Sequence, residues 1–260
     1  MNILCIGDIV GRPGREAVCK LVPELVKEHN IEFVIANAEN ASGGAGIIAK
    51  KALRHFLCGC DLLTTGDHIW DKKDIFDFLD KTPNLLRPLN FPHETPGKGL
   101  FVAEAKNGKK IAVINLLGRV FIRYNVNCPF GAAKEALKQV HKETNIVMVD
   151  FHGEATSEKM ALGYFLDGKV SCVFGTHTHV QTADEKILPK GTAFITDIGM
   201  TGPFDSVIGQ NKESIVERFL TSIPHKFEVA TGDVALNGIV VTINDKTGLA
   251  EKILRIQRRL

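Results

Sequence analysis

Two histidines, His177 and His179, lie two residues apart in the segment VFGTHTHVQTAD, directly after an apolar run. Alternate residues of a strand share a face, so both imidazole rings can reach one polar centre. Four other apolar runs also end in residues that can bind metal ions or move protons. The candidates at the five run ends are Asp8, then Glu39 with Asn40, then Asp67 with His68, then His152, and finally His177 with His179.

These groups can converge, because ligands in α/β folds bind outside the carboxyl ends of the strands. Each has an ordinary alternative: Asp8 could cap a helix, Glu39 and Asn40 could be turn residues before a glycine-rich loop, and a lone histidine is commonly a hydrogen-bonded core residue. Five such ends together favour a metal site. Carboxylates and imidazoles without thiolates suit Fe, Mn, Zn or Mg. The candidates outnumber the ligands of one ion, which predicts a two-metal centre of the kind that activates water and clamps a phosphoryl group.

The elements that would position these residues alternate between strand and helix, which predicts an α/β protein with a mixed sheet. Further helices are expected at about 46–57, 72–79, 131–143, 155–167 and 211–220, besides one within 14–30. Nine apolar runs predict strands at 2–9, 33–40, 61–68, 99–105, 110–118, 146–153, 171–179, 192–200 and 235–244, and the last residues, EKILRIQRRL, a final strand with a solvated end. Nine strands are many for one open sheet. With no linker, repeat or low-complexity tract, residues 1–260 are predicted to form a single domain.

Composition argues against several classes of protein. Hydrophobic residues make up 44% and charged residues 24% of the chain, as in ordinary globular enzymes. The net charge of +2, with both signs interspersed, gives no polybasic field for nucleic acid or a membrane surface. No apolar run could span a bilayer and no signal peptide is recognised, so we expect a cytoplasmic protein.

The six cysteines are expected to be reduced. Cys5, Cys60 and Cys172 lie in or beside strand-like runs, where a thiol packs as a small hydrophobe. The close pair Cys58 and Cys60 could indicate a metal site, but no second pair follows at zinc-ribbon spacing, so packing is favoured.

Five motifs, GDIVGRPGR, NAENASGG, TTGDHIWD, FHGEATSEK and GTHTHVQTAD, occur in this order between Gly7 and the segment around Thr201. In this order they resemble the calcineurin-like metallophosphoesterases, and especially the YmdB type of bacterial phosphodiesterase. The resemblance covers nearly the whole chain. It implies a four-layer α-β-β-α sandwich with two mixed sheets, which would accommodate the nine strands.

The resemblance also implies a role for each candidate residue. Asp8 and His179 would hold the first metal ion, with Glu39 bridging and Asn40 assisting, while Asp67, His152 and His177 would hold the second. The two ions would be Fe or Mn, with Zn or Mg as alternatives. His68 would not be a ligand; it would stabilise the phosphoryl transition state or protonate the leaving oxygen during attack by a metal-bridged hydroxide.

Three positions depart from patterns in this superfamily. Val10 replaces the histidine of the usual Asp-x-His motif and Glu39 replaces a bridging aspartate, and both changes match the YmdB subgroup. Asp67 stands where the family typically has asparagine. With two divalent ions and a bridging hydroxide, Asp67 makes the centre neutral, whereas asparagine would leave one positive charge. Our hypothesis is that Asp67 either favours one trivalent ion or slows catalysis.

The predicted function is hydrolysis of phosphodiesters, with 2′,3′- or 3′,5′-cyclic nucleotides implied by the resemblance. A phosphomonoesterase or nuclease would use the same chemistry, and a homo-oligomer is implied by resemblance only. The alternative is a metal-containing regulatory protein that binds a nucleotide or RNA with little turnover, and the presence of His68 favours catalysis. A nicotinamide-dependent oxidoreductase is disfavoured because GDIVGRPGR has the wrong glycine spacing. Substrate-binding residues stay unassigned. Arg12 and Arg15 could reach an anionic substrate, but solvated arginines at a helix start are commoner, and Arg87 and Lys159 are similarly ambiguous.

Overall fold

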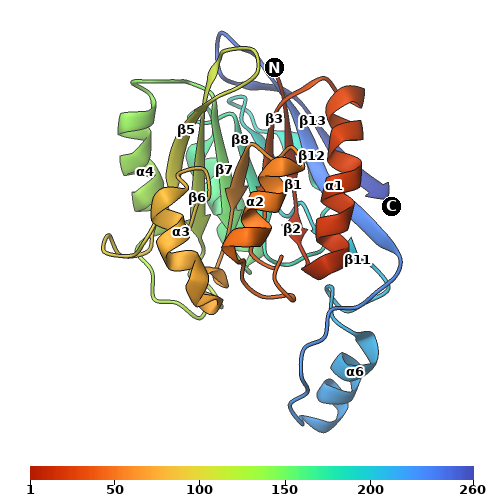
Figure 1. Ribbon diagram of the computed structural model, residues 1–260. Coiled ribbons are helices and arrows are strands. Elements are labelled where there is room, and N and C mark those ends of the chain that lie inside the picture. The colour runs from red at the N-terminus through yellow and green to blue at the C-terminus, as the bar shows by residue number, and fades with distance from the viewer.

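Two mixed β-sheets face each other at the centre of the fold (Figure 1), which a computed structural model describes over residues 1–260. The first sheet has the order β2-β11-β12-β1-β3-β4, with β13 added beside β12. Its strands are β1 (Asn2–Ile6), β2 (Asp8–Ile9), β3 (Ile31–Asn37), β4 (Leu62–Thr64), β11 (Met200–Pro203), β12 (Val234–Ile243) and β13 (Ala250–Arg259).

The second sheet has the order β5-β6-β7-β8-β10-β9. Its strands are β5 (Leu100–Glu104), β6 (Lys110–Leu117), β7 (Val147–His152), β8 (Cys172–Thr176), β9 (Lys186–Ile187) and β10 (Ala193–Ile195). β6, β7, β8 and β10 are parallel to one another, as are β1, β3 and β4 in the first sheet. Parallel neighbours bring their carboxyl ends to the same edge of each sheet.

Helices cover the outer faces of both sheets. These helices are α1 (Gly11–Glu28), α2 (Ala49–Leu57), α3 (Phe76–Lys81), α4 (Pro129–Val140) and α5 (Thr156–Leu166), with short 3₁₀ turns at η1 (Ile69–Asp71) and η2 (Lys73–Ile75); a sixth helix, α6 (Lys212–Thr221), lies elsewhere. α1 shows why: Ala17, Val18, Leu21, Val22 and Leu25 recur at helical spacing and are all buried. No helix is both long and apolar enough to cross a membrane.

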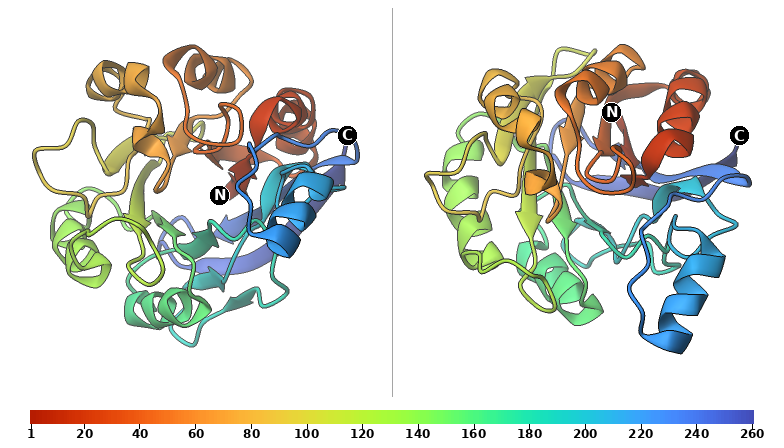
Figure 2. Two further views of the ribbon diagram at one scale, coloured as in Figure 1. Left: turned by 90° about the horizontal axis from the view of Figure 1, so that it is seen from below. Right: turned by 60° about the horizontal axis from the view of Figure 1, so that its bottom comes forward.

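Three hydrophobic cores lie between the layers. One lies between the first sheet and α1 and α2, a second combines residues of both sheets, and a third lies between the second sheet and α4 and α5. This arrangement confirms the predicted four-layer sandwich. α6 differs, because it stands away from the body on an arm (Figures 1 and 2) and leaves Phe219 and Leu220 exposed.

The strands are more finely divided than predicted. The run 2–9 breaks into β1 and β2, and the run 192–200 ends as β10 before the chain crosses to the first sheet as β11. β9 is an additional short strand, while the expected final strand is present as β13. The helix predicted at 72–79 is the 3₁₀ turn η2 followed by α3. Apolar periodicity locates strands, but it does not indicate where a chain changes sheets.

The prediction that all six cysteines are reduced was wrong. Cys19 of α1 and Cys58, directly after α2, form a disulfide with their Cα atoms 4.8 Å apart. The two helices cover the same sheet, so residues 39 positions apart in sequence become neighbours, which spacing alone does not reveal. Cys5, Cys60 and Cys172 are free and buried as predicted, and Cys128 is free and exposed.

Candidate metal centre

The predicted site residues all lie at one edge of the sandwich. The left view of Figure 2 shows this edge from below. Asp8 begins β2, and Glu39 and Asn40 follow β3. Asp67 and His68 follow β4, His152 ends β7, and His177 and His179 follow β8. The parallel strands therefore deliver residues from five separate segments to one place.

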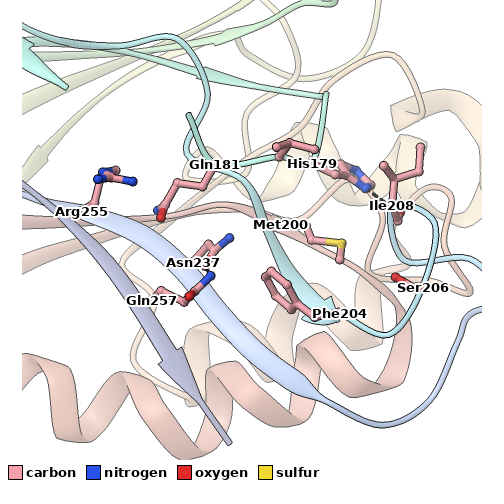
Figure 3. Close-up of a pocket in the computed structure, with 10 residues that line it drawn as sticks. His179, Gln181, Met200, Phe204, Ser206, Ile208, Asn237, Arg255 and Gln257 are labelled. Carbon is pink, nitrogen blue, oxygen red and sulfur yellow. Dashed lines mark hydrogen bonds between the residues drawn. The ribbon is translucent and has the colours of Figure 1, made fainter. Parts of the chain in front are cut away.

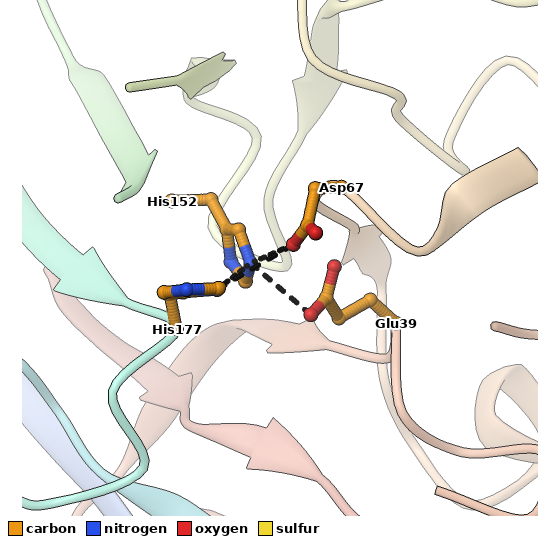
Figure 4. Close-up of side chains that lie close together, drawn as sticks. All are labelled: Glu39, Asp67, His152 and His177. Carbon is orange, nitrogen blue, oxygen red and sulfur yellow. Dashed lines mark hydrogen bonds and ion pairs between the residues drawn. The ribbon is translucent and has the colours of Figure 1, made fainter. Parts of the chain in front are cut away.

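Four of these side chains form a close cluster: Glu39, Asp67, His152 and His177 (Figure 4). One potential ligand atom from each lies within 4.8 Å of the others. His152 Nε2 is 3.1 Å from Glu39 Oε1 and 3.4 Å from Asp67 Oδ1, and His177 Nδ1 lies 3.0 Å from the same nitrogen. All but His177 are buried. Two carboxylates and two imidazoles facing one another at this spacing are a suitable donor set for a divalent cation.

A buried hydrogen-bond chain fixes which nitrogen of His152 faces the cluster. Thr176 Oγ1 donates to Asp150 Oδ1 at 2.7 Å, so it accepts from His152 Nδ1 at 2.9 Å. Asp150 in turn accepts hydrogen bonds from Thr64 and Asn37. With its proton on Nδ1, neutral His152 presents the lone pair of Nε2 to Glu39, Asp67 and His177. Metal-binding histidines are commonly oriented in this way through their second nitrogen.

His177 is oriented from its other side. Its Nε2 lies 3.1 Å from Glu154 Oε2, which leaves Nδ1 directed at the cluster. Its backbone φ is 101° and that of His179 is 67°, so both residues adopt a conformation that side-chain-bearing residues rarely occupy. Such backbone strain persists where the surrounding structure requires a particular side-chain direction.

Asp8, Asn40 and His179 form a second group beside the first. Asp8 Oδ2 accepts from the backbone N–H of His177 at 3.1 Å, and Asp8 Oδ1 lies 3.8 Å from His152 Nδ1. His179 Nδ1 donates to the carbonyl of Ile208 at 2.8 Å, which leaves the lone pair on Nε2, 3.3 Å from Asn40 Oδ1. His179 thus offers the same type of ligand atom as His152.

The ionisation of the cluster shows that it stabilises positive charge. Burial lowers the pKa of His152, but Glu39, Asp67 and Asp8 outweigh burial and hold that pKa well above its usual value. Burial also raises the pKa of Asp67 and Glu39, yet the neighbouring histidines dominate and both pKa values are lowered. Burial raises the pKa of Asp150 to about 6. Without another cation, a proton on His152 offsets only part of the negative charge of Glu39 and Asp67.

Two observations show that these residues fit a metal ion. Asp8 Oδ1 and Asp67 Oδ1 are buried and make no hydrogen bond, and the histidine contacts to Asp67 Oδ1 are at ion-pair distance only. An unpaired buried carboxylate oxygen is costly unless a cation meets it. Gly66 keeps space open, because a Cβ there would collide with both the His152 ring and the Glu39 carboxylate.

His68 is placed differently from the ligand candidates. Its Nδ1 is 2.8 Å from Asp71 Oδ2, while its Nε2 has no partner within the chain. Arg123 lies next to this pair: its Nη2 donates to Asp71 Oδ1 at 2.8 Å and to the carbonyl of Asp67 at 2.6 Å. Its Nε is also 3.4 Å from Asp67 Oδ2, so the Arg123 guanidinium faces the Asp67 carboxylate.

An open cleft of about 490 Å³ leads to the centre. His68, His177 and His179 line it together with Glu39, Asn40 and Glu154. A small phosphoester could therefore reach both groups of candidate ligands and His68 at once.

The cations considered from sequence do not reach this cleft. Lys159 is buried against Asp197 at 2.7 Å, and Arg87 donates to backbone carbonyls around residues 88–96. Arg12 pairs with Glu16, and Arg15 donates to the carbonyl of Ala41.

Sequence reasoning also missed several residues of the site. Asp150 could have been found, because it is an acid inside an apolar strand and shares a strand face with His152. Asn37 could have been found in the same way, because it precedes Glu39 by two residues. Arg123 comes from the loop between β6 and α4 and has no sequence signal.

Comparisons with known proteins agree across the chain. A family model described as YmdB-like protein matches residues 4–256. A Bacillus subtilis (strain 168) protein named 2′,3′-cyclic-nucleotide 2′-phosphodiesterase is 52% identical over 98% of this chain and 96% of its own length.

Two solved structures are similar in both sequence and fold. A Thermus thermophilus protein, described as hypothetical, gives a TM-score of 0.93 at 37% identity, covering 100% of this chain and 99% of the other. A structure described as a novel phosphatase from Mycoplasma pneumoniae gives a TM-score of 0.93 at 35% identity, covering 100% and 93%.

Proposed function

The chain belongs to the YmdB-like family, and from this premise we propose that it is a metal-dependent phosphodiesterase that hydrolyses 2′,3′-cyclic nucleotides. The observation that carries the proposal is the cluster of Glu39, Asp67, His152 and His177 beside Asp8, Asn40 and His179. The 52% identity to a protein named for this activity favours the 2′,3′-cyclic over the 3′,5′-cyclic substrate.

The proposed assignment places two ions in the centre. Asp8 and His179 would hold one ion and Asp67, His152 and His177 the other, with Glu39 shared between them and Asn40 assisting. Iron or manganese is the proposed metal, since the donor set combines oxygen and imidazole nitrogen without thiolate. When bound, such ions acidify water and neutralise charge on a phosphoryl group.

The chain's own residues perform the remaining tasks. Asp150 and Thr176 keep the proton of His152 on Nδ1, and Glu154 orients His177. Asp71 accepts from His68 Nδ1, so a doubly protonated His68 would direct its Nε2–H into the cleft and could give that proton to the oxygen that leaves phosphorus, becoming neutral in the step. Hydrolysis at the 2′ oxygen would add one water molecule and yield a nucleoside 3′-monophosphate. A cytoplasmic location, RNA as a further partner and a homo-oligomer stay predictions.

Hydrolysis of 2′,3′-cyclic AMP tests this function directly. The wild-type protein with added Mn(II) is compared with a variant carrying both Glu39→Gln and His177→Ala, and the products are separated by chromatography. We expect adenosine 3′-monophosphate from the wild type and none from the double variant. Retention of Mn(II) by the wild type without any product would contradict the enzyme proposal and favour a binding protein.

A further inference from the structure

A second cavity, of about 540 Å³, adjoins the metal centre (Figure 3). His179 and Ile208 line both this cavity and the cleft described above. Figure 3 shows these two residues at one end, Arg255 and Gln181 at the other, and Phe204 and Asn237 between them. One end of the cavity is therefore formed by a candidate metal ligand.

Strand pairing fixes how near the cavity lies to the centre. β11 runs parallel to β2 with Met200 paired to Asp8, and the backbone N–H of Met200 donates to the carbonyl of His179 at 3.1 Å. Neighbouring strands are about 4.8 Å apart. Met200, which lines the cavity, is thus one strand away from Asp8. A molecule with its phosphate at the centre could extend into the cavity through a linker the size of one sugar ring.

The cavity is lined by the amide of Asn237, which has a free donor. Asn237 lies in β12 and, taken as a whole residue, is only 1% exposed. Its Oδ1 accepts from Gln257 Nε2 at 3.3 Å, which directs its Nδ2 elsewhere, and Nδ2 has no acceptor within the chain. Gly199 leaves room at this nitrogen, because a Cβ there would come within 2.6 Å of it. Nδ2 is the part of this side chain that reaches the cavity, where a donor without a partner in the chain is available to a ligand acceptor.

Further groups offer complementary hydrogen bonds. Gln181 Nε2 donates to the carbonyls of Gly238 at 3.0 Å and Ile256 at 3.2 Å, so its Oε1 remains as an acceptor. Arg255 uses Nε to pair with Glu185 at 2.8 Å, and its outer nitrogens remain as donors. The cavity therefore carries both donors and acceptors.

An aromatic ring lies beside these polar groups. Phe204 and Met200 line the cavity, yet neither belongs to any of the three hydrophobic cores. A half-buried phenylalanine that packs in no core offers a flat face to a ligand. A face of this kind next to amide groups suits a planar heterocycle, which stacks on aromatic rings and hydrogen-bonds at its edge.

We propose that this cavity binds the nucleobase of the substrate, with Phe204 stacking on the base and Asn237 donating to its edge. The inference rests on the proposed cyclic-nucleotide activity and specifies which part of the chain distinguishes a nucleotide from a simple phosphodiester. Phosphate and base are joined through one ribose, and the two cavities are joined at His179.

Two substrates that differ only in the base test the proposal. 2′,3′-Cyclic AMP is compared with the 2,3-cyclic phosphate of methyl riboside, which has the same reacting group and no base. Phe204→Ala is the main variant, and Phe219→Ala on the exposed face of α6 is the matched control. We expect Phe204→Ala to lower kcat/KM for cyclic AMP about 5- to 150-fold, the range of one base–aromatic stack, mainly through KM. The baseless substrate and the control variant should be unaffected.

Asn237→Leu provides a second variant, and its turnover of the baseless substrate reports whether the metal centre is intact. Equal losses on both substrates, or no loss with cyclic AMP, would overturn the nucleobase site while leaving the phosphodiesterase proposal in place. If the wild type hydrolyses neither substrate, the enzyme proposal fails. In that case the nucleobase site is tested by calorimetry, with adenosine 3′-monophosphate as the ligand. Weaker binding by Phe204→Ala than by the wild type supports the site, and equal binding overturns it.

Discussion

Replacing Thr176 with valine tests how the buried chain behind His152 supports metal binding. Valine has nearly the shape of threonine and lacks the hydroxyl that accepts from His152 Nδ1 and donates to Asp150 Oδ1. Both partners are fully buried, so each loses its hydrogen bond without gaining water. An unsatisfied buried polar group costs about 1–3 kcal/mol.

The loss should appear mainly in metal affinity. Without Thr176 as acceptor, the proton of His152 can move to Nε2, the nitrogen that faces Glu39 and Asp67. Loss of such a supporting partner typically weakens metal binding about 10- to 100-fold. We expect Thr176→Val to raise the Mn(II) dissociation constant within this range, measured by competition with a chromophoric chelator.

Thr176→Ser is the matched control, because it keeps the hydroxyl and removes only a methyl group. It should bind Mn(II) nearly as tightly as the wild type. If Thr176→Val binds Mn(II) as tightly as Thr176→Ser, the hydroxyl does not orient His152 and the reasoning is refuted.

Three other predictions follow from the same geometry. His68→Ala should retain the metal content of the wild type and lose rate by about 100- to 10,000-fold, measured by elemental analysis and steady-state kinetics; loss of metal would make His68 a ligand instead. Asp67→Asn removes one negative charge and should speed Mn(II)-dependent hydrolysis, and an unchanged rate with unchanged metal content and oxidation state would reject the charge argument. Burial, with Arg15 and Arg54 adding to it, lowers the pKa of His55 to about 4, so the unfolded state binds one more proton between about pH 6.5 and 4. The free energy of unfolding should therefore fall by up to about 3 kcal/mol as the pH is lowered through this window. Denaturant titrations of His55→Gln should lack that part of the fall.

Both the fold and the ligand candidates could be predicted from the sequence, and the physical reason is the same. Apolar runs end where a parallel strand leaves the core, and the residue types at those ends are visible without coordinates. Asp8, His152 and His177 come from separate runs, and the structure brings them together at the same edge. The order of the motifs supplied the two-sheet architecture that periodicity alone left open.

Contacts that depend on packing between distant elements were not predictable. Cys19 and Cys58 meet because two helices lie side by side, and Arg123 reaches Asp67 from a loop without a distinctive motif. The cavity proposed to bind the nucleobase was equally unpredictable, since Phe204 follows β11, Asn237 lies in β12, and their spacing in the sequence does not indicate that they meet. Residues on one strand face, such as Asp150 and His152, are an intermediate case, because their spacing in the sequence indicates that they are neighbours although the prediction from sequence did not use it.

Removal and return of metal test the central claim most directly. Metal content per chain and hydrolysis of bis-p-nitrophenyl phosphate are measured on the same preparation of wild-type protein before chelation, after chelation and after titration with Mn(II). Activity should disappear with the metal and return in proportion to bound Mn(II), reaching its maximum at two ions per chain. Undiminished hydrolysis by metal-free protein, or full reloading without any hydrolysis, would contradict a metal-dependent phosphodiesterase.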